Sequence, residues 1–183
     1  TRWDYGYHSD IIGRLIEVAS GQRTADYLQQ RIFDPLGMVD TGFYAPPSKV
    51  DRLVHAYDTQ GRDITANLMP LSDWTARRPF QSNGGGLAGT APDWIRFARM
   101  LLNGGELDGA RVMAPEIAAL GMSDLLPAGV NTDGTYAHGA GFGAGGRVGR
   151  GATEGIFGWG GAAGTIAFVD PRRKVRATGM IQY

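Results

Sequence analysis

A dense run of glycines near the end of the chain leads directly into an apolar segment and then into an Asp-Pro turn. The block from Phe157 to Thr165 contains four glycines, and the apolar residues Ile166–Val169 follow it. A flexible linker would instead be rich in Gly and Ser and would lead into another polar stretch. Glycine in this context lets a ligand or a neighbouring element approach the backbone closely. Two interpretations therefore stay open: a bulged strand packed under a helix, and one wall of a ligand site.

The composition favours one ordinary globular domain and argues against several classes of function. The chain of 183 residues is long enough for a single hydrophobic core, and 18 basic side chains balance 18 acidic ones. Balanced charge gives no electrostatic reason to expect nucleic acid or an anionic membrane surface as a partner. The chain has no cysteine, its histidines lack zinc-binding spacing, and no apolar run approaches the roughly 20 residues of a membrane span. We therefore expect no metal, cofactor or membrane span, and the compartment stays open.

Apolar residues at helical spacing predict two helices at the start of the chain. The first begins at Ser9 or Asp10, either of which can cap it, and ends at Gly21. The second is capped by Thr24 and ends before Pro35, because the residue that precedes a proline disfavours helical backbone angles. The first helix is expected to bury one apolar face. That face consists of Ile11, Ile12, Leu15, Ile16 and Ala19.

The remaining chain is predicted to contain further helices and then strands. One helix begins at Thr90, with a proline and an acid in its first turn, and ends at Gly104; a shorter one begins at Pro115 and ends near Met122. Residues 45–81 are rich in turn formers, with a short strand over residues 53–57. Residues 136–148 are strand-like, and residues 157–169 pair with residues 175–181 in an antiparallel sheet. Helices followed by strands predict an α+β fold, in which helices flank an antiparallel sheet.

Several sequence blocks, taken together and in order, resemble one family of enzymes. The blocks are Trp3–Tyr5, Asp10–Glu17, Ser20–Gln22, Arg31–Met38, Asp40–Phe43, Gly84–Trp94, Met100–Gly105 and the segment that begins at Phe157. Each block is weakly specific, but the series is similar to the serine β-lactamase and penicillin-binding-protein-like family. Within it, the chain resembles the class C-like esterase branch, the family VIII carboxylesterases. The resemblance implies the β-lactamase-like fold and a serine hydrolase that carries three motifs.

The first motif of that family, Ser-x-x-Lys, carries the nucleophile and has no match in this chain. No serine here is followed by lysine three positions later. In the family this motif lies N-terminal to the tyrosine motif, so residues 1–183 look like the C-terminal portion of a single β-lactamase-like domain. Residues 1–81 would be its mostly helical and loop region, and residues 82–183 would supply a helix and the C-terminal antiparallel strands. A complementary N-terminal segment or chain would then bring Ser-x-x-Lys and further strands of the sheet.

The second motif is Tyr-x-Asn in the lactamases of the family, and Tyr5-Gly6-Tyr7 stands in its place. The resemblance makes Tyr5 the catalytic base, because a phenol beside a lysine ammonium can take the serine proton and later return it. Tyr7 replaces the asparagine and is expected to contact substrate. From the residues alone, an alternative is that Tyr5 is a half-buried aromatic side chain stacked on Trp3.

The third motif, Lys-Thr-Gly, is matched in position by Trp159, Gly160 and Gly161. Trp159 would offer the substrate a flat apolar wall where the family's lactamases have a cation, which suits neutral acyl esters. By resemblance the N–H of Ala162 would form half of the oxyanion hole, and the two glycines would keep the site open. A tryptophan packed in the core beside a bulge is the alternative.

The resemblance implies a carboxylesterase that cleaves short acyl esters through an acyl-enzyme intermediate. Its substrate would be a small-molecule ester, or an amide. Hydrolysis of β-lactams or of D-amino peptides is the nearest enzymatic alternative. A non-catalytic binding protein that keeps the fold and lacks the nucleophile is an alternative of a different class.

Overall fold

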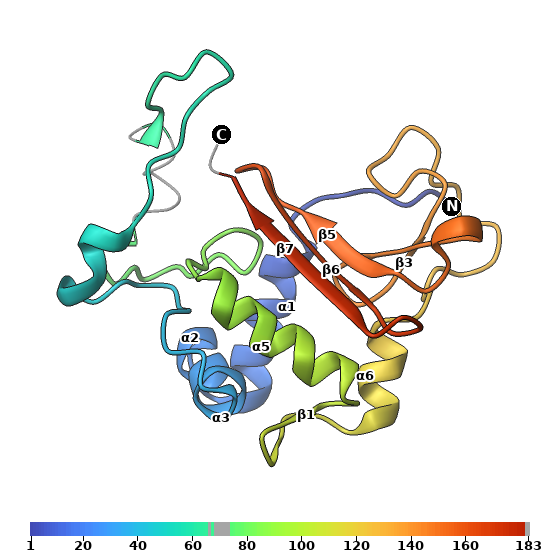
Figure 1. Cartoon of the computed structure of the whole chain (residues 1–183), viewed down its shortest axis with the longest axis horizontal. Coiled ribbons are helices and arrows are strands. Elements are labelled where there is room, and N and C mark those ends of the chain that lie inside the picture. The colour runs from blue at the N-terminus through green and yellow to red at the C-terminus, as the bar shows by residue number, and fades with distance from the viewer. Residues whose placement is uncertain (66, 68–73, 182–183) are drawn as a thin grey trace.

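The computed structural model describes residues 1–65, 67 and 74–181, which form an antiparallel sheet with helices packed beside it (Figure 1). The strand order of the main sheet is β3-β4-β5-β6-β7. These strands are β3 (Gly141–Phe142), β4 (Arg147–Val148), β5 (Phe157–Gly160), β6 (Thr165–Asp170) and β7 (Val175–Met180). The predicted α+β fold, an antiparallel sheet flanked by helices, is confirmed.

The glycine-rich block forms the β5–β6 hairpin instead of the single strand predicted over residues 157–169. A turn over residues 161–164 interrupts that strand, and the Gly161 N–H donates to the Thr165 carbonyl at 2.7 Å. Gly164 adopts a left-handed φ of 78°, which side-chain-bearing residues disfavour. A Cβ at Gly161 would lie only 2.2 Å from Thr165 Oγ1. Glycine is therefore needed here for a tight turn, which periodicity alone did not predict.

Strands β6 and β7 pair as predicted across a turn that Asp170 organises. The Asp170 carboxylate accepts hydrogen bonds from the backbone N–H groups of Arg172 and Arg173, both at 3.0 Å, and from the Arg173 guanidinium at 2.8 Å. Among the described strands, β7 is an outer strand of the sheet. One row of its backbone N–H and C=O groups therefore faces away from β6.

Helix α5 (Ala91–Leu102) packs beside the sheet and contacts β6 and β7 (Figure 1). It begins as predicted, because Thr90 Oγ1 accepts a hydrogen bond from the Asp93 N–H at 3.4 Å. Asp93 itself is buried, and its carboxylate accepts hydrogen bonds from the Asp40 N–H and the Thr41 hydroxyl, at 2.7 and 2.9 Å. The start of α5 is thus tied to the segment around residue 40. The shorter predicted helix is also present, as α6 (Pro115–Gly121).

The prediction that the second helix ends before Pro35 is wrong. Helix α2 (Thr24–Leu28) passes into a π-helical turn (Gln29–Phe33) and then into α3 (Asp34–Leu36). Pro35 lies in the first turn of α3, and its fixed φ is compatible with helical backbone. The helical segment ends at Gly37, which has a left-handed φ of 62°.

Helix α1 (His8–Ser20) ends at Gly21 as predicted, but it begins before the predicted caps. Tyr7 occupies the N-cap position without a side-chain hydrogen bond. The Asp10 carboxylate is engaged elsewhere, since it accepts hydrogen bonds from the backbone N–H groups of Asn83 and Gly84, at 2.7 and 3.2 Å. A tertiary contact has therefore taken the side chain that the sequence assigned to capping.

The apolar face of α1 is largely exposed, contrary to the prediction that it is buried. Ile11, Ile12 and Leu15 are 62%, 52% and 61% exposed, and Val18 beside them is 67% exposed. Of this helix only Gly13 is buried, and no element within the described residues covers the apolar face. Periodicity predicts which side chains share a face, but it does not supply the partner that covers them.

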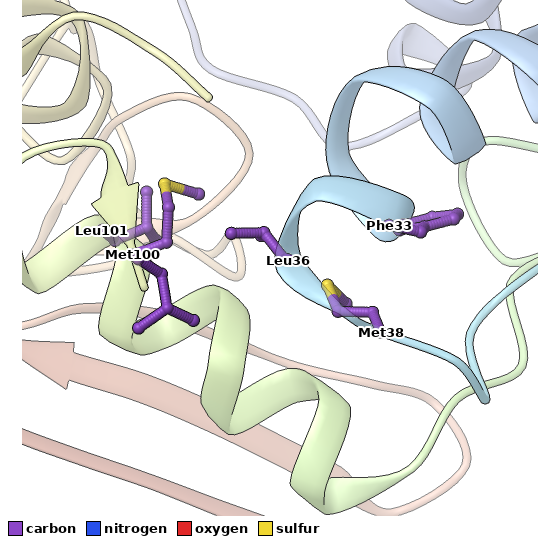
Figure 2. Close-up of a cluster of buried hydrophobic side chains, with 6 residues drawn as sticks. Phe33, Leu36, Met38, Met100 and Leu101 are labelled. Carbon is purple, nitrogen blue, oxygen red and sulfur yellow. The ribbon is translucent and has the colours of Figure 1, made fainter. Parts of the chain in front are cut away.

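The main hydrophobic cluster lies where α3, α5 and a small hairpin meet. Leu36 points toward Met100 and Leu101 of α5 (Figure 2), and both Leu36 and Met100 are fully buried. The hairpin consists of β1 (Glu106–Leu107) and β2 (Ala110–Arg111), which were not predicted. Its turn is an Asp-Gly pair in which both residues have positive φ, 50° and 84°. That dipeptide is a strong hairpin signal, and the two-residue strands around it were too short to show periodicity.

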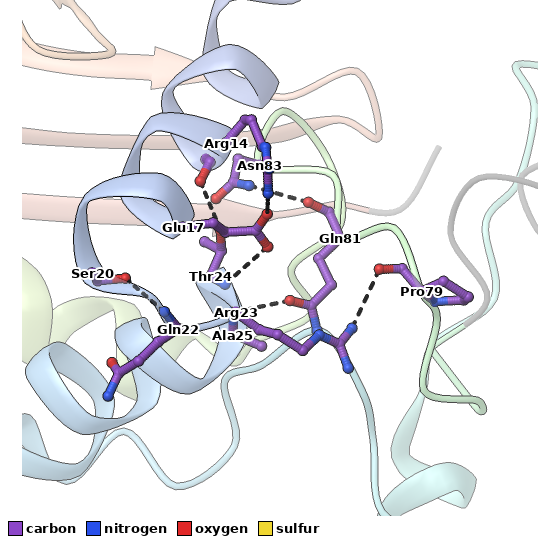
Figure 3. Close-up of polar contacts among 11 residues, drawn as sticks. Arg14, Glu17, Ser20, Gln22, Arg23, Thr24, Ala25, Pro79, Gln81 and Asn83 are labelled. Atoms are coloured by element: carbon purple, nitrogen blue, oxygen red, sulfur yellow. Dashed lines mark hydrogen bonds and ion pairs between the residues drawn. The ribbon is translucent and has the colours of Figure 1, made fainter.

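A polar network joins α1 to α2 and to the segment that precedes the Gly84–Gly86 loop (Figure 3). Glu17 accepts hydrogen bonds from Arg14 and from the Thr24 N–H, at 3.0 and 3.3 Å. These contacts, that with Arg14 first, hold the pKa of Glu17 below its usual range. The Gln81 side chain accepts a hydrogen bond from the Ala25 N–H at 3.0 Å. The helix that follows Tyr5 is thus anchored on one side while its apolar face stays open.

Two weaker strand predictions are wrong or only partly right. Residues 53–57 follow a 3-10 helix (Pro47–Arg52) and form no strand; Tyr57 makes only an isolated bridge, to Asp63. Residues 66 and 68–73 of the predicted loop-rich region lie outside the described residues. Of residues 136–148 only β3 and β4 are strands, because turns with positive-φ glycines at 139 and 145 interrupt the pairing. A further 3-10 helix (Gly151–Thr153) lies between β4 and β5.

Candidate active site

Tyr5 lies in the extended segment that enters α1, and its ring rests on Trp159 of β5. The two rings are stacked, with centroids 5.5 Å apart and an interplanar angle of 27°. The entering segment is held by the Trp3 N–H, which donates to the Asn131 carbonyl at 3.0 Å. Tyr5 is 43% exposed, so its side chain remains accessible. The structure therefore brings together the residues that matched the second and third motifs.

Trp159 is partly buried and lies at the centre of a group of rings. Trp3, Phe142 and Tyr136 surround it, with centroid distances of 6.5, 5.3 and 6.4 Å. Phe142 is itself buried, so this part of the indole packs as a core residue would. Tyr5 and Tyr136, which are more exposed, lie on the same indole. The contact with buried Phe142 fits the interpretation of Trp159 as a packed core residue, and the contacts with Tyr5 and Tyr136 leave the other interpretation open.

The end of β5 leads to a backbone N–H, that of Ala162, for which the described residues provide no acceptor. Gly160 pairs with Ile166 on β6, and Gly161 donates to Thr165. Ala162 follows in the turn and is exposed, and among the described residues its N–H donates to no acceptor. An oxyanion donor must be unengaged and aimed at the place where charge develops. The Ala162 N–H meets the first of these requirements.

Tyr7 stands apart from this group of rings. Its carbonyl accepts hydrogen bonds from the Asp10 and Ile11 N–H groups at the start of α1, both at 3.1 Å. Its side chain is directed to solvent, with the residue 84% exposed, and it makes no ring contact within the described part of the chain. The structure therefore groups Tyr5 with Trp159 and the strand end that follows, but it does not bring the Tyr7 ring to them.

Two side chains beside Tyr5 were not among the predicted site residues. The Tyr136 ring lies edge-on to Tyr5 with centroids 5.6 Å apart, and the His8 ring does so at 5.5 Å. Tyr136 belongs to the loop between α6 and β3, far from both motifs in sequence. A large aromatic residue among turn formers was the available signal, but only the fold places it at the site.

The described residues contain no group of three or more His, Cys, Asp or Glu side chains able to hold a metal ion. His55 and His138 each pair with one aspartate, Asp63 at 2.7 Å and Asp133 at 3.2 Å. Hydrogen bonds from Thr65, and then from His55, lower the pKa of Asp63 to about 2. In the same part of the chain, no helix is long and apolar enough to cross a membrane.

The described elements have the β-lactamase-like fold. The sheet is antiparallel and flanked by helices, and a tyrosine at the entry to α1 meets a Trp-Gly-Gly strand end. The chain belongs to the Beta-lactamase family, whose model matches residues 1–182. The resemblance and the fold inferred from the sequence blocks are thereby confirmed.

Individual proteins similar to this chain include one named as an esterase and one titled as a hydrolase with acyltransferase activity. A protein named lovastatin esterase, from Penicillium rubens, is 30% identical to this chain. The alignment is 205 positions long and covers 100% of this chain and 51% of that protein. The solved structure of EstCE1, titled a hydrolase with promiscuous acyltransferase activity, has a TM-score of 0.79 and 24% identity, over 97% of this chain and 50% of that one. Unliganded simvastatin synthase (LovD) from Aspergillus terreus has a TM-score of 0.81 and 20% identity, over 100% of this chain and 50% of that one. The two structures support the fold alone, and the chain spans about half the length of these proteins.

Proposed function

We propose that the complete protein is a serine hydrolase of the carboxylesterase type, which cleaves short acyl esters through an acyl-enzyme intermediate. The observation that carries this proposal is the stacking of Tyr5 on Trp159, at the strand end that leads to the free N–H of Ala162. A proton carrier, an apolar wall and an oxyanion donor are what acyl transfer requires besides the nucleophile. The name of the Penicillium rubens relative supports an ester as the bond that is cleaved.

In the proposed reaction, Tyr5 takes the proton of the nucleophilic serine as the serine oxygen attacks the ester carbonyl carbon. The bond to the alcohol oxygen then breaks, and Tyr5 returns the proton to that oxygen. Water repeats the two steps on the acyl-enzyme and releases the acid. The Ala162 N–H would donate to the carbonyl oxygen as that oxygen gains negative charge. Removing one such donor lowers kcat by a factor of about 10²–10³.

The nucleophile would come from a complementary N-terminal segment or chain that carries Ser-x-x-Lys. Two described surfaces suit such a partner: the exposed apolar face of α1, directly after Tyr5, and the outer edge of β7. Similar proteins are about twice as long as this chain, which leaves room for a segment of that kind. A lysine ammonium brought next to Tyr5 would favour the phenolate over the phenol.

Trp159 favours neutral esters over substrates that carry a carboxylate. An indole in place of the lysine of Lys-Thr-Gly removes the cation that would bind the carboxylate of a β-lactam. The rings of Trp3 and Phe142 pack on this indole and support an apolar wall. Hydrolysis of β-lactams or D-amino peptides therefore remains the second candidate, and a non-catalytic binding protein the third.

A reconstitution experiment separates these candidates. The chain is produced with its upstream coding segment and, in parallel, alone, and both are assayed with p-nitrophenyl butyrate, nitrocefin and a D-Ala-D-Ala peptide. We expect a burst and steady turnover of the ester only when the upstream segment is present, with a butyryl group on the serine of Ser-x-x-Lys by mass spectrometry. Turnover confined to nitrocefin or the peptide would instead establish the second candidate. Binding without any acyl adduct would establish the third.

A further inference from the structure

Tyr136 is an exposed aromatic residue carried by an ordered turn. The neighbouring Ala137 is fully buried and Thr132 is nearly so, whereas Tyr136 is 72% exposed. The Thr135 hydroxyl donates to the Thr132 carbonyl at 2.7 Å, and the His138 N–H donates to the Thr135 carbonyl at 3.1 Å. The backbone therefore holds the ring in a defined place without burying it. A single exposed ring is ordinary on a protein surface, so its surroundings decide whether it has a role.

Those surroundings are the two principal residues of the candidate site. The Tyr136 plane makes angles of 75° with Tyr5 and 76° with Trp159, at centroid distances of 5.6 and 6.4 Å. Since Tyr5 and Trp159 are themselves stacked, Tyr136 stands nearly perpendicular to the pair. We call these three rings the aromatic corner. Such a corner offers a flat ligand both a stacking partner and an edge-on partner, the two arrangements that aromatic rings prefer.

No arginine within the described part of the chain lies over a ring of the aromatic corner. Within the described residues, the arginine side chains that lie over tyrosine rings do so at Tyr27 and Tyr44. The titratable side chains close to Tyr136 in sequence, His138 and Asp133, contact each other, with His138 Nδ1 3.2 Å from an Asp133 carboxylate oxygen. The exposed faces of the corner are therefore aromatic carbon, with the hydroxyl groups of the two tyrosines and the His8 ring beside them.

We propose that the aromatic corner binds an aromatic ring in the alcohol half of the ester, and that Tyr136 determines this specificity. The assignment to the alcohol half follows from the role of Tyr5, because a residue that returns a proton to the leaving oxygen must lie beside the alcohol. Tyr136 touches Tyr5 and therefore lies on the same side of the scissile bond. This inference rests on the proposed function, whose substrate class it specifies.

The kinetic test uses esters that differ only at a distance from the reacting carbonyl. In 2-phenylethyl, 2-cyclohexylethyl and n-butyl acetate, two or more methylene groups separate any ring from the ester oxygen, so intrinsic reactivity is similar. In the complete protein, Tyr136→Ala should raise KM for the phenylethyl ester about tenfold, which corresponds to the interaction free energy of one aromatic pair. The same change should alter kcat less than about twofold. Tyr136→Phe should retain the preference, and Tyr136→Leu, which keeps apolar bulk, should lose it. Tyr57→Ala, on a distant exposed loop, is the matched control.

A binding measurement separates failure of this inference from failure of the proposed function. Saturation-transfer NMR on the complete protein should show contact with 2-phenylethanol, weaker contact with 2-cyclohexylethanol, and loss of both in Tyr136→Ala. If that pattern is found but no ester is cleaved by the complete protein, the proposed function fails and the aromatic corner is still a binding site. If esters are cleaved but Tyr136→Ala lowers all three rates equally, the inference is wrong and the function survives. A preference for acetylcholine over its neutral isostere 3,3-dimethylbutyl acetate would also overturn it, because the corner would then select a cation.

Discussion

The Tyr5 ring lies on the Trp159 ring, and through this contact the entry of α1 and the end of β5 form one surface. The stacked pair has its centroids 5.5 Å apart, and Ala162 follows three residues further along the chain from Trp159. A change in either ring will therefore alter the position of the other. Substitutions at Tyr5 and Trp159 are expected to be non-additive, and each needs a measurement of stability beside the measurement of rate.

Replacing Tyr5 with Phe should abolish proton transfer while the fold is kept. The substitution preserves the ring that stacks on Trp159 and removes only the phenol oxygen. In the complete protein we expect kcat to fall at least about 100-fold, the lower end of what general acid–base groups contribute, with an unchanged melting temperature. Tyr7→Phe is the control, because the exposed Tyr7 ring stands apart from the site, and this variant should lower kcat far less than Tyr5→Phe does. Near-full kcat in Tyr5→Phe would contradict the assignment of the base.

Exchanging Trp159 for Lys should shift the substrate preference from apolar esters toward β-lactams that carry a carboxylate. The change replaces a flat apolar wall with a cation that can pair with that carboxylate. The ratio of kcat/KM for nitrocefin to that for p-nitrophenyl butyrate should rise. Trp159→Phe, which keeps an aromatic ring against Tyr5, should leave the ratio nearly unchanged. An equal loss on both substrates would show that Trp159 acts only in packing.

The exposed face of α1 should be needed for assembly but not for the stability of the chain itself. Leu15→Lys places a charge on a residue that is 61% exposed, so the melting temperature of the 183-residue chain should shift little. The same change should weaken association with the upstream segment and prevent recovery of esterase activity, because the charge would be buried in the interface. Val54→Lys, at a residue 65% exposed on the distant loop, is the matched control. Full recovery of activity in Leu15→Lys would place the interface elsewhere.

Gly158 and Gly160 lie on the same strand but should differ in their tolerance of a methyl group. A Cβ at Gly158 would lie 2.3 Å from the Ala167 carbonyl oxygen and 2.6 Å from Phe168 Cβ, whereas at Gly160 the nearest atom is 3.7 Å away. Gly158→Ala should therefore destabilise the chain by about 1–3 kcal/mol, as overpacking does. Gly160→Ala should be close to neutral. Chemical denaturation of the two variants measures the difference, and equal stabilities would contradict the packing of β5 on β6.

The turn between β6 and β7 should stabilise the chain only while Asp170 is ionised. The hydrogen bond from the Arg173 side chain, followed by that from the Arg173 backbone N–H, lowers the pKa of Asp170. A lowered folded-state pKa means that this stabilisation is complete above the unfolded value of about 3.9 and is lost as the pH falls through the folded value. The melting temperature of Asp170→Asn should thus lie below that of the parent at pH 6 and approach it only as the pH falls through the lowered pKa of Asp170. Glu154→Gln, at an exposed carboxylate 3.5 Å from Arg172, should show no such dependence.

The sequence by itself determined the elements whose causes lie within a few residues. Thr90 and Asp93 start α5, Gly21 ends α1, and Asp170 turns β6 into β7, because capping and turn formation depend on neighbouring backbone groups. The family blocks, read in order, were enough to predict the β-lactamase-like fold, which the family match confirms. The pairing of the second and third motifs was implied by resemblance, and the structure places Tyr5 on Trp159.

Only the tertiary structure decided which remote segments meet. The periodicity of α1 correctly grouped Ile11 and Leu15 on one face, yet that face is exposed, because burial depends on an element elsewhere in space. Asp10 left its expected capping role for the backbone of Asn83, a contact that no local signal announces. Tyr136 lies beside Tyr5 although most of the chain separates the two residues in sequence. Local backbone preferences act over a few residues, whereas the contacts that build the site join segments from both ends of the chain and from its middle.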